Sequence, residues 1–219
     1  MIHLRHEVGK YPERVSMFFD LEQQDFFFTE DANSLFYEGA WESVLIEDGN
    51  NALVHAFARN PISAAGSCDV EPLVGYSGPL ANTAQVEFLR AALTEYSAFC
   101  NQGGIVAELI RFNPLMRNHE PLKGLCVGLS LVEGKPMAYI RLSSDHEAML
   151  ASYAPDCRKK VRKGFRLYEH RVLSKSPEEW SMFVAMYRRS MQVLGADSAW
   201  LFDDAFFERR MLQYHRIGG

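Results

Sequence analysis

The sequence predicts an α+β (mixed α/β) protein in which a mixed β-sheet is flanked by helices. First, two strand-like segments, 41–47 and 52–59, are joined by Asp48-Gly49-Asn50, a turn composition typical of a β-hairpin. Second, an amphipathic segment at 82–102 has helical spacing, and a strand-like segment at 105–115 follows it directly. Third, the last third of the chain contains strong helix-start signals.

The N-terminal elements come before the hairpin. Residues 12–20 predict a short helix, and Phe18-Phe19 and Phe26-Phe27-Phe28 are expected to anchor a hydrophobic core. After the hairpin, the return strand ends at Pro61, and residues 62–68 predict another short strand.

A Gly-rich stretch, Gly75-Tyr76-Ser77-Gly78-Pro79-Leu80, predicts a tight backbone feature. Asn82 is expected to cap the following helix, with Gln85 three positions later. The apolar face of that helix consists of Val86, Leu89, Leu93, Tyr96 and Cys100. Gly103-Gly104 is expected to end the helix, and the next strand runs into a polar tip, Arg111-Phe112-Asn113-Pro114. This order of turn, helix and strand is typical of a ligand-binding corner in an α/β domain.

The middle of the chain predicts two more strands, at 125–132 and 137–142, around a turn at 133–136. Ser144 and Glu147 predict a capping box for a short helix.

Three further elements are expected before the C-terminus. Pro155 is expected to start a helix that ends at Gly164, and residues 165–173 alternate like a strand. The run Ser176-Pro177-Glu178-Glu179 predicts the start of a long amphipathic helix that Gly195 ends. Asp203 or Asp204 is expected to start a last helix.

The charge is unevenly distributed along the 219 residues, whose net charge is −5. Residues 1–150 contain 10 Lys/Arg and 20 Asp/Glu, a net charge of −10, and residues 151–219 contain 13 and 8, a net charge of +5. The basic C-terminal third is therefore expected to meet any phosphate-bearing ligand.

Other features exclude whole classes of protein. No run of about 18 apolar residues is present, so no membrane span is expected, and the N-terminus has no apolar signal core. The four cysteines, which form no CxxC pair, and the scattered histidines predict free thiols in a reducing compartment and no metal site. We expect a cytoplasmic protein with no bound cofactor and no DNA partner.

A basic cluster occupies the predicted helix after Pro155, and its members are Arg158, Lys159, Lys160, Arg162, Lys163 and Arg166. On a helix, Arg158 and Arg162 share one face, and Lys159 and Lys163 share the next. Like charges repel at this spacing, so the cluster is consistent with phosphate binding; a solvated helix face is the alternative.

Three blocks of sequence resemble the FemAB-like acyltransferases, which are tandem-domain relatives of the GCN5-related N-acetyltransferases (GNAT). The blocks are 69–80 (DVEPLVGYSGPL), 111–115 (RFNPL) and 158–164 (RKKVRKG). The resemblance implies a GNAT-like first domain over residues 1–154. It also implies that residues 155–219 hold the basic helix and the incomplete start of a second GNAT-like domain. A truncated fragment, an interrupted reading frame and a naturally short variant all remain open.

The resemblance also implies a function: transfer of an acyl or aminoacyl group to an amine of a cell-envelope (peptidoglycan) precursor or polysaccharide. The co-substrate would be an acyl-CoA or an aminoacyl-tRNA, and a homo-oligomer remains open. Because no Q/R-x-x-G-x-G/A pyrophosphate loop precedes a helix, acetyl-CoA is the less favoured donor. The alternative function is a catalytically degenerate GNAT-fold module that binds a phosphate-bearing ligand or a protein.

Candidate site residues follow from position and resemblance together. Asp69 and Glu71 are the carboxylates nearest the Gly-rich stretch, and we take them as candidate general bases. The candidate substrate-binding residues are Tyr76, Ser77, Gly78, Arg111, Asn113, Arg158, Lys159, Arg162 and Lys163. Tyr76 is alternatively a packed aromatic residue, and Arg111 alternatively pairs with Asp69 or Glu71. In the bridge-forming branch of the family an acidic residue follows the Gly-Pro element, whereas here Asn82 holds that place.

Overall fold

The computed structural model describes residues 1–62, 66–73, 75–125, 128–170, 172–174 and 176–217. The chain divides into two compact units, Met1–Glu133 and Gly134–Gly219. This division falls earlier in the chain than the boundary after residue 154 that the sequence predicts. The two units are described separately below.

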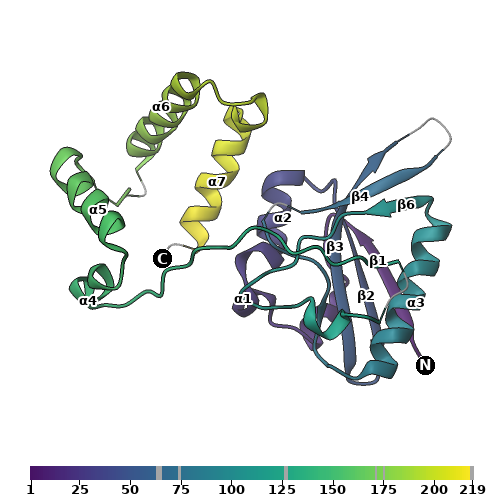
Figure 1. Cartoon of the computed structure of the whole chain (residues 1–219). Coiled ribbons are helices and arrows are strands. Elements are labelled where there is room, and N and C mark those ends of the chain that lie inside the picture. The colour runs from purple at the N-terminus through teal and green to yellow at the C-terminus, as the bar shows by residue number, and fades with distance from the viewer. Residues whose placement is uncertain (63–65, 74, 126–127, 171, 175, 218–219) are drawn as a thin grey trace. The chain divides into compact units, whose positions relative to one another are not determined.

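The N-terminal unit contains a six-stranded mixed sheet, which confirms the predicted α+β class (Figure 1). The strand order is β1-β2-β3-β4-β6, and the short β5 pairs with β3. All neighbours are antiparallel except β4 and β6, which run parallel. The strands are β1 (His3–Val8), β2 (Glu42–Asp48), β3 (Asn51–Pro61), β4 (Cys68–Pro72), β5 (Leu80–Ala81) and β6 (Ile105–Glu108).

The predicted hairpin at residues 41–59 is confirmed. Strands β2 and β3 pair from Glu42↔Phe57 to Asp48↔Asn51, and Gly49 in the turn has a positive φ of 60°. The strand predicted at 62–68 is wrong for the residues described, because residues 62, 66 and 67 are not in a strand and β4 begins only at Cys68. Residues 63–65 lie outside the described residues.

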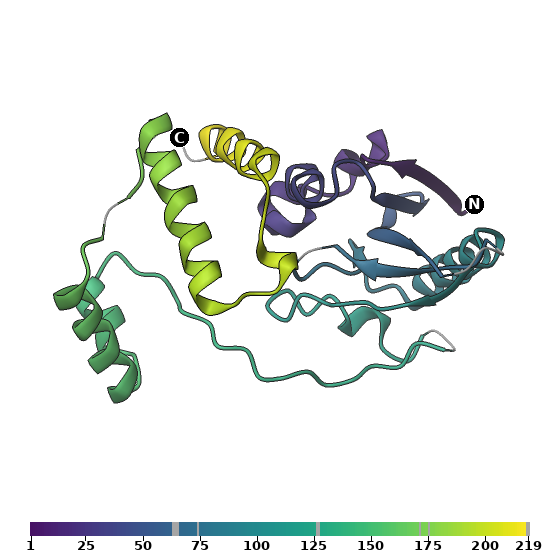
Figure 2. The same ribbon diagram turned by 90° about the horizontal axis from the view of Figure 1, so that it is seen from above.

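Helices cover both faces of this sheet, so the central strands are buried on both sides (Figure 1, Figure 2). The short N-terminal helices pack against one face; they are η1 (Glu13–Met17), α1 (Leu21–Gln24), η2 (Phe26–Phe28) and α2 (Glu30–Tyr37). Phe19 and Phe28 are core residues on that side and Phe18 packs against them, as the sequence predicts, and Trp41 is buried with them. Helix α3 (Val86–Gln102) covers the other face through Phe88, Leu89 and Tyr96.

Helix α3 begins later than the sequence predicts, and Asn82 does not cap it. The N-cap residue is Gln85, without a side-chain capping bond. Asn82 instead holds the hairpin: its Oδ1 accepts from the Ala52 N–H at 2.8 Å, and its Nδ2 donates to the Asn50 carbonyl at 2.9 Å. Asn is favoured at helix caps, but here its side chain hydrogen-bonds to backbone groups about 30 positions away. The local sequence is compatible with both roles.

The strands predicted at 125–132 and 137–142 are wrong for the residues described. Residues 128–143 contain neither helix nor strand, and most of their side chains are exposed. Residues 126 and 127 lie outside the described residues. The alternating pattern is present, but a strand also needs a hydrogen-bonded neighbour, and none of the described strands pairs with this segment. The predicted strand at 105–115 is also shorter than expected, since β6 ends at Glu108.

The C-terminal unit is helical in its described residues. Its helices are α4 (His146–Ala151), α5 (Pro155–Leu167), α6 (Pro177–Leu194), η4 (Ser198–Trp200) and α7 (Asp204–Ile217). A further short helix, η3 (Glu120–Leu122), belongs to the N-terminal unit. Helices α6 and α7 are tied by Arg188, whose Nη2 donates to Asp204 at 2.7 Å, and by the rings of Tyr187 and Phe207, whose centroids lie 5.4 Å apart.

The capping predictions in this unit have mixed outcomes. Ser176 caps α6, because its Oγ accepts from the Glu179 N–H, and Gly195 ends that helix with a φ of 60°. The capping box of Ser144 and Glu147 is wrong, because Asp145 caps α4 by accepting from the Ala148 N–H at 2.9 Å. The strand predicted at 165–173 is also wrong: α5 continues to Leu167, and the described residues after it form no strand.

Within the described residues, no helix is long and apolar enough to span a membrane. Cys68, Cys100 and Cys157 are free thiols, and Cys126 lies outside the described residues.

The Glu42–Arg59 ion pair predicts how the stability of the N-terminal unit depends on pH. Arg59 Nε and Nη2 each donate to one oxygen of Glu42 at 2.8 Å. Burial alone would raise the pKa of Glu42, but hydrogen bonds from Arg59 and His6 outweigh it and hold this pKa below its ordinary value of 4.5. Such a carboxylate stabilises the fold above its ordinary pKa, and the contribution is lost as the pH falls through the folded-state pKa.

We therefore expect the stability difference between wild type and Glu42→Gln to be largest at neutral pH and to narrow below a pH of about 4.5. Chemical denaturation at a series of pH values measures this difference. Glu87→Gln, at an exposed position of α3, is the matched control and should show a difference that is small at every pH. A Glu42→Gln difference that stays constant with pH would contradict the argument.

Candidate functional site

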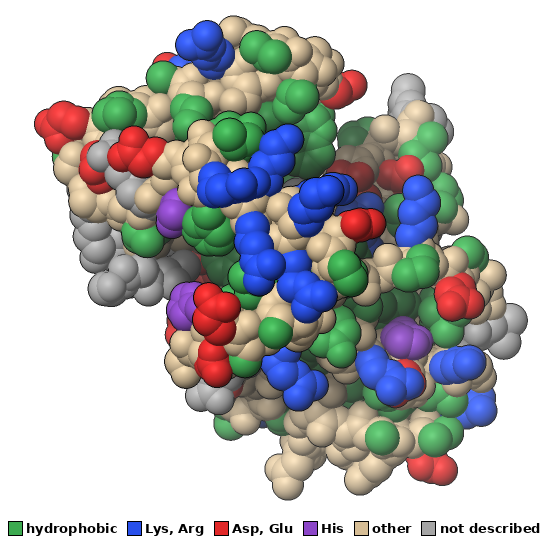
Figure 3. Space-filling model, turned by 60° about the vertical axis from the view of Figure 1, so that its left-hand side comes forward, with side chains coloured by type: hydrophobic (Ala, Val, Ile, Leu, Met, Phe, Trp, Pro, Cys, Tyr) green, Lys and Arg blue, Asp and Glu red, His purple; other side chains and the backbone are tan. Residues whose placement is uncertain are grey.

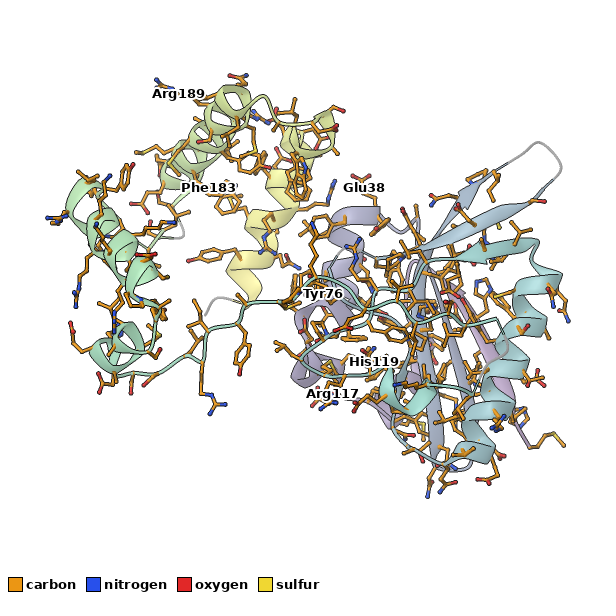
Figure 4. All side chains as sticks on the ribbon, in the orientation of Figure 1. Glu38, Tyr76, Arg117, His119, Phe183 and Arg189 are labelled. Carbon is orange, nitrogen blue, oxygen red and sulfur yellow. The ribbon has the colours of Figure 1, made fainter. Side chains whose placement is uncertain are left out.

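Two segments far apart in the sequence meet just beyond the ends of β4 and β6. The Ser77 backbone N–H donates to the Arg111 carbonyl at 3.0 Å, and Ser77 forms a parallel β-bridge with Phe112. The Gly-rich stretch and the Arg-Phe-Asn-Pro tip therefore lie side by side. We call residues 75–80 and 111–118 together the corner. Figure 4 labels Tyr76 in its first segment and Arg117 in its second.

The side chain of Asn118 joins the two segments of the corner. Its Nδ2 donates to the carbonyls of Ser77 at 2.7 Å and Pro79 at 3.0 Å, and its Oδ1 accepts from the Asn113 N–H at 2.8 Å. Asn118 is buried, so these bonds are shielded from water. This role is not predictable from the sequence, because a single Asn in a polar loop carries no local signal of such partners.

Asn113, predicted to bind substrate, already uses its side chain within the fold. Its Oδ1 accepts from the backbone N–H groups of Leu115 at 3.0 Å and Met116 at 3.1 Å. Its Nδ2 donates to Asp25 Oδ2 at 3.1 Å, which ties the corner to the segment between α1 and η2. Because Asn113 is also buried, these contacts favour a structural role for it.

Two glycines allow the close packing of the corner. Gly75 has a φ of 97°, and a Cβ placed there would lie 2.3 Å from the ring of Phe27. Gly78 has a φ of 76°, and its Cβ would lie 3.0 Å from Ile110 Cγ2 and 3.1 Å from the Phe112 ring. Both positions therefore require glycine for the backbone conformation and for space.

After β4 the chain leaves the sheet next to β6, and it returns to the sheet at β5. The Gly-rich stretch lies in the segment between these two strands. The last regular contact is the Leu109 N–H to the Val70 carbonyl at 3.1 Å, and the next is between Ser77 and Arg111. Along β3, the pairing with β4 ends at Phe57, and the pairing with β5 starts at Val54. The chain between β4 and β5 therefore departs from the sheet opposite residues 55 and 56 of β3.

A buried histidine–carboxylate pair lies at this point of the sheet. His55 on β3 is only 2% exposed, and its Nε2 lies 2.5 Å from Oε1 of Glu108, the last residue of β6. Nδ1 of His55 is buried and has no hydrogen-bond partner among the residues that the structure describes. The Glu108 side chain is 16% exposed, so this carboxylate is partly accessible. This pair is not predictable from the sequence, where the histidines are only scattered. His55 and Glu108 are 53 positions apart and meet only in the folded sheet.

Helix α3 adds Tyr96 and Cys100 to this cluster. The Tyr96 ring packs against His55 at a centroid distance of 5.5 Å. Burial raises the pKa of Tyr96 far above its ordinary value, and the nearby Glu108 carboxylate raises it further. Burial likewise raises the pKa of Cys100 to about 11, so this thiol stays protonated at neutral pH. Both side chains therefore keep their protons at neutral pH, and Cys100 is a poor nucleophile.

The predicted bases on β4 differ from this pair in their surroundings. Asp69 is half-buried, and its Oδ1 is buried without a hydrogen-bond partner in the described part of the chain. Glu71 is exposed. Arg111 is exposed too. The alternative interpretation required an ion pair from Arg111 to Asp69 or Glu71, and none is present among the described residues. Tyr76 is 39% exposed, so it is not the packed aromatic residue of the alternative interpretation.

Ser77, another predicted substrate-binding residue, is 3% exposed, and within the described ranges its buried Oγ has no hydrogen-bond partner.

The basic residues predicted to bind phosphate lie on α5, in the C-terminal unit. Arg158 is half-buried and its Nη1 donates to the Ala151 carbonyl at 2.7 Å, at the end of α4. Lys159, Arg162 and Lys163 are exposed. Figure 3, which brings the side of the C-terminal helices forward, shows Lys and Arg side chains beside hydrophobic ones on this face.

Two hollows lie on the surface of the described residues. One, of about 560 Å³, lies along α3 and is lined by residues from Arg90 to Asn101 together with Leu125. The other, of about 220 Å³, lies on α5 between Val161, Gly164, Phe165, Tyr168 and His170. Neither has a predicted site residue among its described lining residues. Among the residues that the structure describes, no group of three His, Cys, Asp or Glu side chains is arranged to hold a metal ion.

Comparison of the chain with protein-family models, with curated proteins and with solved structures finds no match in any of the three.

Proposed function

We propose that the chain is an acyl- or aminoacyltransferase of the GNAT-like, FemAB-like type. The observation that supports this most is the separation of the parallel strands β4 and β6 around the Gly-rich corner, directly beside the His55–Glu108 pair. The order of a first strand, helices and a meander β2–β4 before that corner agrees with what the resemblance implies for a GNAT-like first domain. The assignment of the C-terminal unit to a second such domain stays a prediction.

The transfer would proceed by direct attack of an amine on the acyl carbonyl. A carbon–nitrogen bond forms, the bond from the carbonyl carbon to the oxygen or sulfur of the donor breaks, and the leaving group takes up a proton. A base must accept one proton from the amine, and hydrogen-bond donors must stabilise the oxyanion that develops. We assign the base to Glu108 rather than to the earlier candidates Asp69 and Glu71.

Glu108 combines three properties that suit a base. It is partly accessible, it lies where β4 and β6 separate, and His55 holds its carboxylate at 2.5 Å from within the core. Glu71 is exposed to water without a described partner that would orient it, and Asp69 has one oxygen turned into the interior. A base is most effective when its position is fixed before the substrate arrives.

The donor and acceptor follow from the resemblance and the charge. The donor is an acyl-CoA or an aminoacyl-tRNA, and the acceptor is an amine of a cell-envelope or sugar precursor in the cytoplasm. Both donors carry phosphate, and the cations of α5, with Arg162 and Lys163 exposed, supply the complementary charge.

Binding and turnover by the full chain test this function. Calorimetry with acetyl-CoA, a longer acyl-CoA and a bulk aminoacyl-tRNA should show binding of one donor class. That donor should then be consumed only when an amine acceptor is added. Absence of binding to every donor would overturn the proposal.

Asn82 favours a second candidate, a binding module without catalysis. It holds the place of an acidic residue in the bridge-forming branch, and both ends of its amide are engaged by the β2–β3 hairpin. Such a module would bind a phosphate-bearing ligand or protein and leave the donor intact. Donor binding without amine-dependent consumption, over a panel of amines, would favour this candidate.

A further inference from the structure

Helix α5 has two opposed faces, and phosphate binding accounts for only one of them. With 3.6 residues per turn, Cys157, Val161, Gly164, Phe165 and Tyr168 fall on one side of the helix. The rest of the circumference holds the basic cluster, Arg158, Lys159, Lys160, Arg162, Lys163 and Arg166, together with Pro155, Leu167 and a single acidic residue, Asp156. We call the first side the apolar face of α5.

The apolar face is uncovered in the C-terminal unit. No residue of α5 is buried, and Phe165 and Tyr168 are 62% and 72% exposed. The His170 ring meets the Phe165 ring edge-on at a centroid distance of 4.7 Å, and together with Val161 they border the hollow of about 220 Å³. Exposed aromatic side chains grouped in this way indicate a surface that is covered when it functions.

We propose that α5 docks onto an anionic lipid surface, with its apolar face in the headgroup region and its cations around the phosphates. A short helix with Lys and Arg on one face and Phe or Tyr on the other is the arrangement that lies in the plane of a membrane interface. Cations next to the apolar face, such as Arg158 and Arg162, reach the headgroups while their methylene stems stay in contact with the lipid. The charge of α5 is complementary to anionic lipid and selects it over a neutral bilayer.

Two other occupants fit the helix less well. A nucleic acid or a free phosphate ligand would use the basic cluster but leaves the aliphatic part of the apolar face, including Val161, in water. A protein segment would cover the apolar face but has no need of the surrounding cations. The lipid surface uses both faces. It competes with the donor phosphate of the proposed function for the same cations, but lipid binding itself does not require the transfer reaction.

Vesicle co-sedimentation of the full chain tests the inference. The vesicles are pure phosphatidylcholine, or phosphatidylcholine with one third phosphatidylglycerol, and we expect binding to the second kind alone. Lys159→Ala/Lys163→Ala should weaken partitioning roughly 30-fold, since each cation near an anionic surface strengthens partitioning roughly fivefold. Val161→Ser/Phe165→Ser should weaken it roughly tenfold or more.

A matched control separates location from charge. Lys123→Ala/Arg189→Ala removes the same charge from exposed positions outside α5, and should leave binding within roughly a factor of two to three of wild type. Because α5 has no buried residue, the variants should keep the circular dichroism of the wild type.

Three results would overturn the inference. They are no binding to anionic vesicles, equal loss in the control variant, and loss with the lysine variant but not with Val161→Ser/Phe165→Ser. In the last case, competition by bulk tRNA or by inorganic polyphosphate would identify a phosphate or nucleic-acid site instead. None of these results depends on whether the chain transfers acyl groups, so failure here and failure of the proposed function are distinguishable.

Discussion

Replacing Gly75 by alanine is expected to lower the free energy of unfolding of the N-terminal unit by about 3 kcal/mol. The φ of 97° at this position disfavours any residue with a Cβ. In addition, the Cβ would lie 2.3 Å from the Phe27 ring, well inside contact distance. Phe27 is half-buried, and the three closest atoms, Cδ1, Cε1 and Cγ, all belong to its ring and lie within 2.5 Å, so the side chain has to move as a whole to relieve the contact.

Two companion variants separate the backbone cost from the steric cost. Gly39 has a φ of 83°, and a Cβ at this position would have nothing within 4 Å, so Gly39→Ala should cost only about 1 kcal/mol. Phe27→Ala removes the clashing ring, so Gly75→Ala made in that background should also cost about 1 kcal/mol. Urea denaturation followed by tryptophan fluorescence measures the free energy of unfolding of Gly75→Ala, Gly39→Ala, Phe27→Ala and the Phe27→Ala/Gly75→Ala double variant. Equal costs for Gly75→Ala and Gly39→Ala would contradict the steric argument.

The hairpin and the long helices depend on local signals, and the sequence predicts them well. A Gly between two alternating segments gives the β2–β3 turn, and Ser176 with Pro177 gives the start of α6. The two glycines of the corner are required by their positive φ values, so a Gly-rich stretch marks the place where the chain leaves the sheet.

The wrong predictions share one cause, which is a residue type that fits two environments. Asn82 suits a helix cap and a hairpin clamp equally, and only the folded chain selects the second. The segments 125–132 and 137–142 suit two strands, but a strand also needs a neighbour with free N–H and C=O groups. Neither the role of Asn82 nor the presence of a pairing strand can be predicted from a short segment of sequence.

The same limit applies to the candidate site. Asp69 and Glu71 are the carboxylates that lie next to the Gly-rich stretch in sequence. His55 and Glu108 are separated by 53 positions and come together only because β3 and β6 lie in one sheet on either side of β4. Proximity in sequence is a poor guide to a site that strands assemble.

Glu108→Gln is expected to reduce the rate of amine-dependent donor consumption by roughly two to four orders of magnitude while donor affinity stays unchanged. Glutamine keeps the size of the side chain and a hydrogen bond to His55, but it cannot accept the proton of the attacking amine. The loss should therefore appear in kcat and not in the calorimetric Kd of the donor.

Glu71→Gln and Asp69→Asn are the discriminating controls, because each makes the same chemical change at a carboxylate that the sequence favoured. Both variants should keep most of the wild-type kcat. A large loss with Glu71→Gln and none with Glu108→Gln would return the base to β4 and reduce the His55–Glu108 pair to a structural contact. In that case Glu108→Gln should still destabilise the N-terminal unit by about 1 kcal/mol or more, because a buried hydrogen bond to His55 is weakened. A thermal melt of each variant therefore separates a lost structural contact from a lost proton acceptor.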